Sequence, residues 1–163
     1  MTDELTRIFG TIEHENLTEE NKRDLLEIFK ITRNHGLRGT IALLFADLEY
    51  HDAVPAIIEK INDKDLFNRN GTLVYVLNSL EAGEYFLNFI KIVAEHDYEA
   101  RLGAYQLVEK YAPTVSEPIL AKAIAKLEQA QHKEEQNYPE KYDNSKLHFI
   151  DATLRLLQPA SNE

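Results

Sequence analysis

The sequence predicts an all-α fold, a short right-handed superhelix in which helix pairs stack one after another. Apolar residues recur at the i, i+1, i+4 spacing of a helix face in three segments that begin 32 residues apart, at Leu25, Ile57 and Phe89. A second series has the same period and begins at Gly39, Gly71 and Gly103. A fixed period of this length that holds two helices is typical of α-solenoids, in which each pair buries its apolar face against its neighbours.

This period predicts three 32-residue helix pairs over residues 18–113, preceded by a capping helix within residues 1–16. The expected pairs are 18–34 with 37–50, 52–62 with 66–81, and 83–96 with 98–112. Ser116, Glu117 and Pro118 then combine an N-cap hydroxyl, an acid in the first turn and a proline whose missing N–H is tolerated there. A further helix is therefore predicted from this point to about His132.

Residues 116–158 are predicted to form a degenerate last pair. Residues 133–144 are polar and contain Pro139, which predicts a loop, and four leucine and isoleucine residues at helical spacing predict a final helix over 145–158. Six glycines and five prolines are too few for a turn-rich sandwich or barrel. A length of 163 residues predicts one helical-repeat domain, residues 1–163.

Composition narrows the class of partner. The chain carries 18 Lys and Arg against 28 Asp and Glu, a net charge of −10, which repels phosphate backbones and anionic membranes. We therefore expect a basic or neutral protein partner, with no nucleic acid and no membrane. The absence of cysteine excludes thiolate nucleophiles and thiolate metal sites. The N-terminal residues lack the basic and apolar segments of a secretory signal, so a cytoplasmic location is expected.

The segment from Ala53 to Asp63 resembles the first helix of a HEAT repeat. Asp65 with Arg69, and Asp97 with Arg101, are similar to the turn between the two helices of such a repeat. The resemblance implies that these four residues form a structural ladder between neighbouring repeats. It also implies a scaffold for macromolecular recognition more often than an enzyme, and it names no partner.

A candidate binding surface lies on the second helix of each pair. At about 100° per residue, Leu73, Val76, Leu77 and Leu80 define a core face, and other residues point nearly the opposite way. If these helices line the concave side of a solenoid, they present a stripe of partly accessible residues: Leu43, Ala46, Tyr75, Asn78, Leu107 and Lys110. Asp47, Glu49 and Asp52 form an acidic flank beside it. The alternative is that the stripe is buried, by close helix contact or under the C-terminal helix.

Residues for catalysis or metal binding are not indicated. The six histidines show no pair at the spacing that places two ligands on one helix face, and His51 and His96 are expected to be exposed at repeat junctions. Single glycines form no phosphate-binding loop, and no nucleophile elbow occurs. We therefore assign no catalytic residue, no metal and no cofactor.

The sequence favours a non-catalytic protein-protein interaction module, an acidic adaptor or an immunity-type inhibitor of a basic partner such as a nuclease toxin. Two alternatives stay open. HEAT-like DNA glycosylases hold a duplex on the concave surface, which needs a basic face where this stripe offers Lys110 and Arg38. The third reading is a structural subunit of a larger assembly, for which oligomeric state is the discriminating property.

Overall fold

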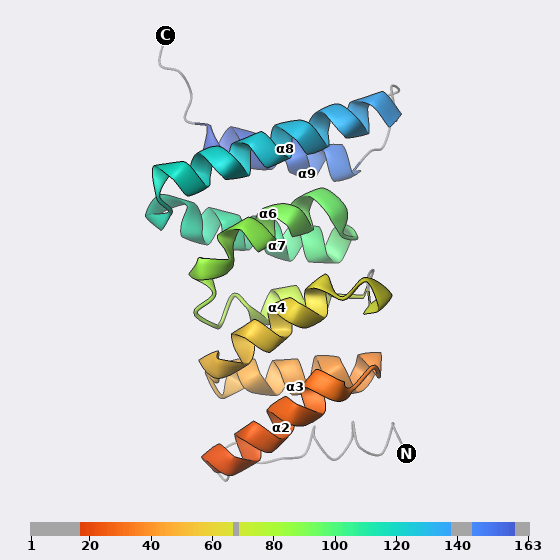
Figure 1. The fold of residues 1–163 in the computed structure, drawn as a ribbon, viewed down its shortest axis with the longest axis vertical. Coiled ribbons are helices and arrows are strands. Elements are labelled where there is room, and N and C mark those ends of the chain that lie inside the picture. The colour runs from red at the N-terminus through yellow and green to blue at the C-terminus, as the bar shows by residue number, and fades with distance from the viewer. Residues whose placement is uncertain (1–16, 67–68, 138–144, 159–163) are drawn as a thin grey trace. The chain divides into compact units, whose positions relative to one another are not determined.

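A computed structural model describes residues 17–66, 69–137 and 145–158 (Figure 1). These residues contain eight α-helices and no strand, which confirms the all-α prediction. The predicted capping helix within residues 1–16 lies outside the described residues. The chain divides into two compact units, Met1–Ala82 and Gly83–Glu163, and each is considered by itself.

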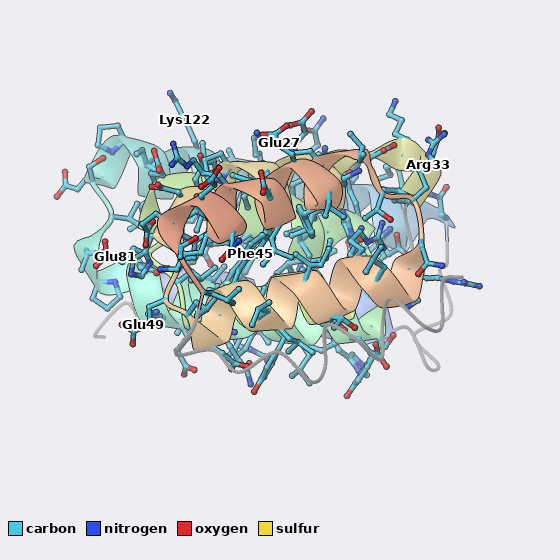
Figure 2. All side chains as sticks on the ribbon, turned by 90° about the horizontal axis from the view of Figure 1, so that it is seen from below. Glu27, Arg33, Phe45, Glu49, Glu81 and Lys122 are labelled. Carbon is cyan, nitrogen blue, oxygen red and sulfur yellow. The ribbon has the colours of Figure 1, made fainter. Side chains whose placement is uncertain are left out.

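The first unit contains α2 (Glu19–Ile31), α3 (His35–Asp47), α4 (Val54–Asn62) and α5 (Gly71–Val76). Helix α2 packs against α3 and α4, and α5 packs against α3 and α4. Phe45 lies between α2 and α3 (Figure 2), where its ring contacts those of Phe29 and Tyr50 at centroid distances of 5.8 and 5.6 Å. The aromatic cluster fixes α3 against the helix that precedes it in sequence.

Helix α5 is much shorter than the predicted helix 66–81. Residues Lys64–Leu66 form a 3₁₀ turn, and the α-helix ends at Val76. Beyond it, successive i to i−3 hydrogen bonds tighten the chain, including Asn78 N–H to the Tyr75 carbonyl at 3.1 Å and Ser79 N–H to the Val76 carbonyl at 3.1 Å. Asn and Ser favour turns over helix interiors because their side chains compete for backbone hydrogen-bonding groups. The apolar pattern therefore extends to Leu80, although α5 ends at Val76.

The second unit contains α6 (Phe86–Glu95), α7 (Tyr98–Tyr111), α8 (Glu117–Asn137) and α9 (Ser145–Leu157). Helix α6 packs against all three others, and α9 packs against α7 and α8. Buried apolar side chains from all four helices form the core, among them Phe89, Val108, Leu127 and Ile150. Here the atypical C-terminal pair completes the burial of the third repeat.

Helix α8 continues to Asn137, so the predicted loop was wrong over 133–137, and residues 138–144 lie outside the described residues. Two side chains near the C-terminal end of α8 contact α9. Glu134 is buried and pairs with Lys146 at 2.8 Å, and Gln131 donates to Asp151 at 2.8 Å. Within 133–137 only Glu134 is buried, and the exposed polar residues around it lie on the outer side of a helix where a loop was predicted.

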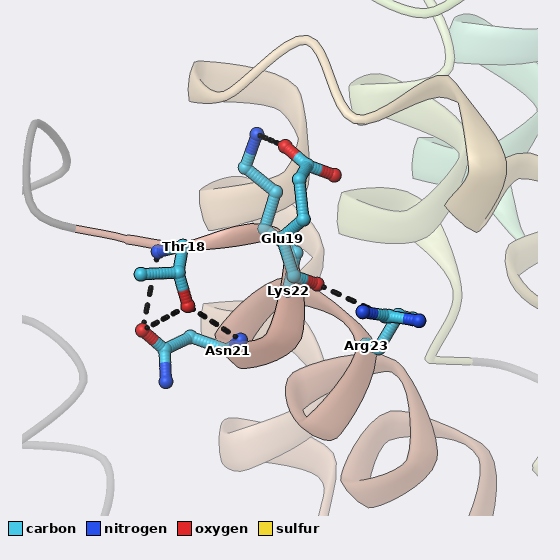
Figure 3. Close-up of polar contacts among 5 residues, drawn as sticks. All are labelled: Thr18, Glu19, Asn21, Lys22 and Arg23. Carbon is cyan, nitrogen blue, oxygen red and sulfur yellow. Dashed lines mark hydrogen bonds and ion pairs between the residues drawn. The ribbon is translucent and has the colours of Figure 1, made fainter.

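The start of α2 is fixed by a reciprocal capping box (Figure 3). The Thr18 hydroxyl accepts from the Asn21 backbone N–H at 3.2 Å, and the Asn21 side-chain oxygen accepts from the Thr18 backbone N–H at 3.1 Å. Glu19 and Glu20 follow in the first turn, where a negative charge interacts favourably with the helix dipole. The cap supplies partners for backbone N–H groups that α2 itself cannot satisfy.

Replacing Thr18 with Ala is expected to lower the free energy of unfolding by about 0.5–2 kcal/mol, because the cap is lost while its backbone partners remain. Thr40→Ala is the matched control. Its hydroxyl only back-bonds to the Gly36 carbonyl within α3, at 3.0 Å, so Ala at that position should be neutral or slightly stabilising. Urea unfolding of both variants measures the difference, and an unchanged midpoint for Thr18→Ala would contradict the assignment.

Candidate functional site

Helices α3 and α5, with the turn that follows α5, present an outward surface, here named the α3–α5 face, made of Leu43, Ala46, Tyr75 and Asn78. The Leu43 side chain is 42% exposed and that of Tyr75 is 63% exposed, while Ala46 and Asn78 are partly exposed. The opposite sides of the two helices are buried through residues such as Phe45 and Val76. The four stripe residues of the first unit therefore lie where the helical period placed them.

The two helices that carry this face are in direct contact. Gly39 of α3 lies against the Thr72 side chain of α5, because a Cβ atom on Gly39 would be 3.7 Å from Cγ2 of Thr72, an ordinary van der Waals distance. Leu43 and Tyr75 follow one helical turn later on their respective helices. Two large apolar side chains at equivalent repeat positions thus share one surface of the first unit.

Four exposed carboxylates gather where α3 and α5 end, and we name them the acidic end: Asp47, Glu49, Asp52 and Glu81. Figure 2 shows Glu49 and Glu81 at one end of the view and Arg33 at the other. Glu49 and Glu81 are one repeat period apart. The Glu81 backbone N–H donates to Nδ1 of His51 at 3.1 Å, which ties the two chain turns together.

Glu49 occupies an unfavourable local position. Its φ is +50°, in the left-handed region where a glycine normally ends a helix, and its N–H bonds to the Ala46 carbonyl at 3.1 Å. A non-glycine residue in that region costs about 1–2 kcal/mol. Asp47 and Glu49 also place negative charge at the negative end of the α3 dipole. Local helix stability therefore does not account for either acid.

The third repeat departs from the predicted stripe. Lys110 is exposed, with Nζ 4.9 Å from the centroid of the Tyr111 ring, but Leu107 is fully buried. The prediction that Leu107 is accessible was wrong, because α9 packs against α7 in addition to α6 and leaves α7 buried on two sides. Continuity of the stripe from the first unit to the second stays a prediction.

The four predicted ladder residues have different surroundings. Asp65 pairs with Arg33 at 2.7 Å, and both side chains are largely exposed. Arg33 and Asp65 are one period apart, a signal that the comparison of repeats could have used. Asp97 caps α7 by accepting from the Ala100 N–H at 3.1 Å. The partner of Asp65 is thus an arginine that sequence reasoning missed.

The two predicted ladder arginines differ in burial. Arg69 is exposed, whereas Arg101 is partly buried and its Nε is buried without a hydrogen-bond partner. Burial lowers the pKa of Arg101, and the nearby carboxylates of Glu134 and Asp97 oppose that shift. Arg101 therefore lies beside the buried carboxylate of Glu134 in the core of the second unit.

Arg38 was counted with Lys110 as a cation that the stripe offers, and this was wrong because Arg38 is buried. Its side chain is 1% exposed, and Nη2 donates to the Arg69 carbonyl at 3.0 Å. Desolvation lowers its pKa, with Asp63 opposing the shift. Asn70, one period later, is also buried and donates to the Ile61 carbonyl at 3.2 Å. In both repeats the residue before the repeat glycine holds a neighbouring backbone segment in place.

The two histidines at the repeat junctions, His51 and His96, differ in burial. His51 is exposed as predicted, but His96 is 1% exposed, so the expectation for it was wrong. It follows α6 directly, where its N–H closes the helix on the Ile92 carbonyl at 3.0 Å. Within the part of the chain that the structure describes, no group of three His, Asp or Glu side chains is placed to hold a metal ion. Nor does any described helix have the length and apolar character to cross a membrane.

No protein-family model, curated protein or solved structure matches the chain. The resemblance to HEAT repeats therefore stays a prediction. The class that the fold defines is an all-α protein whose described residues form two compact helical units. Its function has to be argued from its own surfaces.

Arg101→Ala is expected to lower the free energy of unfolding by about 1–3 kcal/mol, because it removes a packed side chain and a cation beside the buried Glu134 carboxylate. Arg69→Ala, at an exposed position, should change it by less than about 0.5 kcal/mol. Urea unfolding measures both. Equal destabilisation by the two variants would restore the predicted ladder, in which both arginines carry the same role.

His96 should make stability depend on pH. Burial lowers the pKa of its imidazole from 6.5 to about 4, with Asp97 opposing the shift and Lys91 and Arg101 adding to it. The unfolded chain therefore binds the proton more readily, so stability is complete above pH 6.5 and is lost as the pH falls toward 4. Between pH 7 and pH 5 this loss amounts to about 2 kcal/mol.

The variant His96→Leu should lose this part of the pH dependence in urea unfolding at pH 7, 6 and 5. His148→Leu is the control, because His148 is exposed on α9. A wild-type slope that persists in His96→Leu would assign the pH dependence to other groups.

Proposed function

We propose that the chain is a non-catalytic protein-binding module that docks a basic protein on the α3–α5 face and the acidic end. The observation that carries the proposal is the pairing of exposed Leu43 and Tyr75 on two packed helices, beside four exposed carboxylates. Protein interfaces commonly have an apolar and aromatic centre with a polar rim, and tyrosine is enriched among the residues that dominate binding energy.

Charge supports a basic partner. The net charge of −10 attracts a cationic protein while the two diffuse toward each other. The exposed carboxylates of the acidic end lie beside Leu43 and Tyr75. Asp47 at the end of α3 and Glu49 just beyond it place negative charge where the helix dipole opposes it. A partner that pairs with them would offset this cost on binding.

A nuclease is one class of partner that fits this chemistry, because a nucleic-acid site is basic and an acidic inhibitor can occupy it. This reading makes the chain an immunity-type protein. A DNA glycosylase-type enzyme would instead need a basic surface for the duplex, and the α3–α5 face has none of the chain's lysines or arginines. A structural subunit would bury the same face in a permanent assembly.

Tyr75→Ala is expected to weaken partner binding by about 1–3 kcal/mol, because an aromatic anchor at the centre of an interface is lost. Tyr98→Ala is a matched control, since Tyr98 is 58% exposed but belongs to the second unit. Quantitative affinity capture with wild type and both variants identifies the protein retained by wild type and Tyr98→Ala only. Calorimetry with that purified protein then gives the affinities, and equal losses for the two variants would contradict the site.

The acidic end is tested at Glu49. Glu49→Gln removes the charge and keeps the left-handed backbone, so it should slow association, and less so at high salt. Glu49→Gly removes the charge and the strain together, so it should slow association equally while raising the free energy of unfolding by about 1 kcal/mol. Stopped-flow association and urea unfolding separate the two effects. Faster or unchanged association in both variants would exclude the acidic end from the encounter.

Two measurements separate the competing classes. A gel shift at low salt with duplex DNA should show no binding, whereas the glycosylase reading requires a shift. Size-exclusion chromatography with light scattering should show a monodisperse species without the partner. A chain that is insoluble or polydisperse until mixed with other subunits would favour the structural reading.

A further inference from the structure

The second unit contains a half-open cavity of about 460 Å³ between α6, α8 and α9. Its apolar part is formed by Ile90 and Ala94 of α6 and Ala130 of α8, and Ile90 is fully buried, so it forms the floor. A volume of this size falls within the range of small-molecule sites in proteins, which is roughly 300–1,000 Å³. The cavity is lined by residues of the second unit alone, whereas the α3–α5 face belongs to the first unit.

Four lysines from three helices line this cavity, in a chain whose net charge is strongly negative. Lys91 comes from α6, Lys126 and Lys133 from α8, and Lys146 from α9. Lys126 and Lys133 are seven residues apart, which is two helical turns, so both project from the same side of α8. Convergence of like charges on one cavity is unfavourable in the absence of a counter-charge.

The carboxylates at the cavity do not cancel this charge. Glu134 is buried and is paired with Lys146 at 2.8 Å. Its carboxylate is also close enough to Arg101 to oppose the lowering of the Arg101 pKa by burial. Glu95 is exposed on α6. Among the described residues that line the cavity, four lysines thus exceed two carboxylates by two positive charges, and Lys126 and Lys133 are both exposed.

We propose that this cavity, here named the lysine pocket, binds a phosphate monoester that carries an apolar or aromatic body. The phosphate lies between Lys126 and Lys133, and the body packs over Ile90, Ala94 and Ala130. A monoester is close to doubly charged at neutral pH, which matches the excess of two positive charges, and lysine ammonium groups are frequent phosphate ligands. The site is independent of the protein-binding function proposed above.

The experiment is isothermal titration of the full chain with four named probes. Adenosine monophosphate and phenyl phosphate carry both the charge and the body, inorganic phosphate lacks the body, and adenosine lacks the charge. We expect the two monoesters to bind at least tenfold more tightly than inorganic phosphate or adenosine, with affinity that falls as salt is raised.

The double variant Lys126→Gln, Lys133→Gln should weaken binding of both monoesters at least tenfold. Lys122→Gln is the matched control, because Lys122 projects from the outside of the ribbon (Figure 2) on the same helix, one turn before Lys126. It is not among the residues that line the cavity. Ala130→Leu keeps every charge and fills the apolar part, so it should abolish the preference for the monoesters. Circular dichroism melting confirms that each variant is folded.

Three results would overturn the proposal. The first is the absence of binding by either monoester at millimolar concentration. The second is equal binding of inorganic phosphate and the esters, which would remove the role of the apolar floor. The third is an equal loss in Lys122→Gln and in the double variant, which would reduce the effect to general charge.

Discussion

Short amphipathic helices impose the constraint on which this structure depends, because none of them can remain helical alone. Helices α4, α5 and α6 contain 9, 6 and 10 residues, below the length of about 12–15 at which an isolated helix is even marginal in water. Their stability comes from burying one face against a neighbour. The exposed side chains of Leu43 and Tyr75 are carried by helices that this burial fixes.

The apolar period predicted the helices well wherever capping and burial agreed with it. The predicted segments 52–62 and 98–112 correspond to α4 and α7 to within two residues. It failed over 66–81, because Asn78 and Ser79 favour turns even where the surrounding leucines remain buried. It failed again at the end of α8, where the buried Glu134 pairs with Lys146 of α9 and the helix continues to Asn137. Periodicity reports which side chains are buried, and backbone hydrogen bonding decides whether the chain is helical.

The candidate face was predictable in part. Leu43 and Tyr75 are exposed because each points away from the single buried side of its helix, which the period alone determines. Leu107 has the same position in its repeat but is covered, because α9 returns to pack on α7. The burial of Arg38 was equally hidden, since its hydrogen bond to the Arg69 carbonyl depends on the path of a loop. Contacts between elements distant in sequence decide these cases, and a single sequence does not contain them.

Net charge is a property of the whole chain, and it does not describe the charge of each surface. The first unit places acids at the end of α3, where the helix dipole and the left-handed backbone of Glu49 both oppose them. The second unit gathers four lysines around a cavity, and one of them, Lys146, pairs with the buried Glu134. The left-handed backbone of Glu49 lowers the stability of the isolated fold. Residues chosen against local stability are expected where a protein meets its ligands, because the bound molecule supplies the missing interaction. The opposite signs of the two groups are the reason why the two proposals assign them different ligands, a cationic partner to the first unit and an anion to the second.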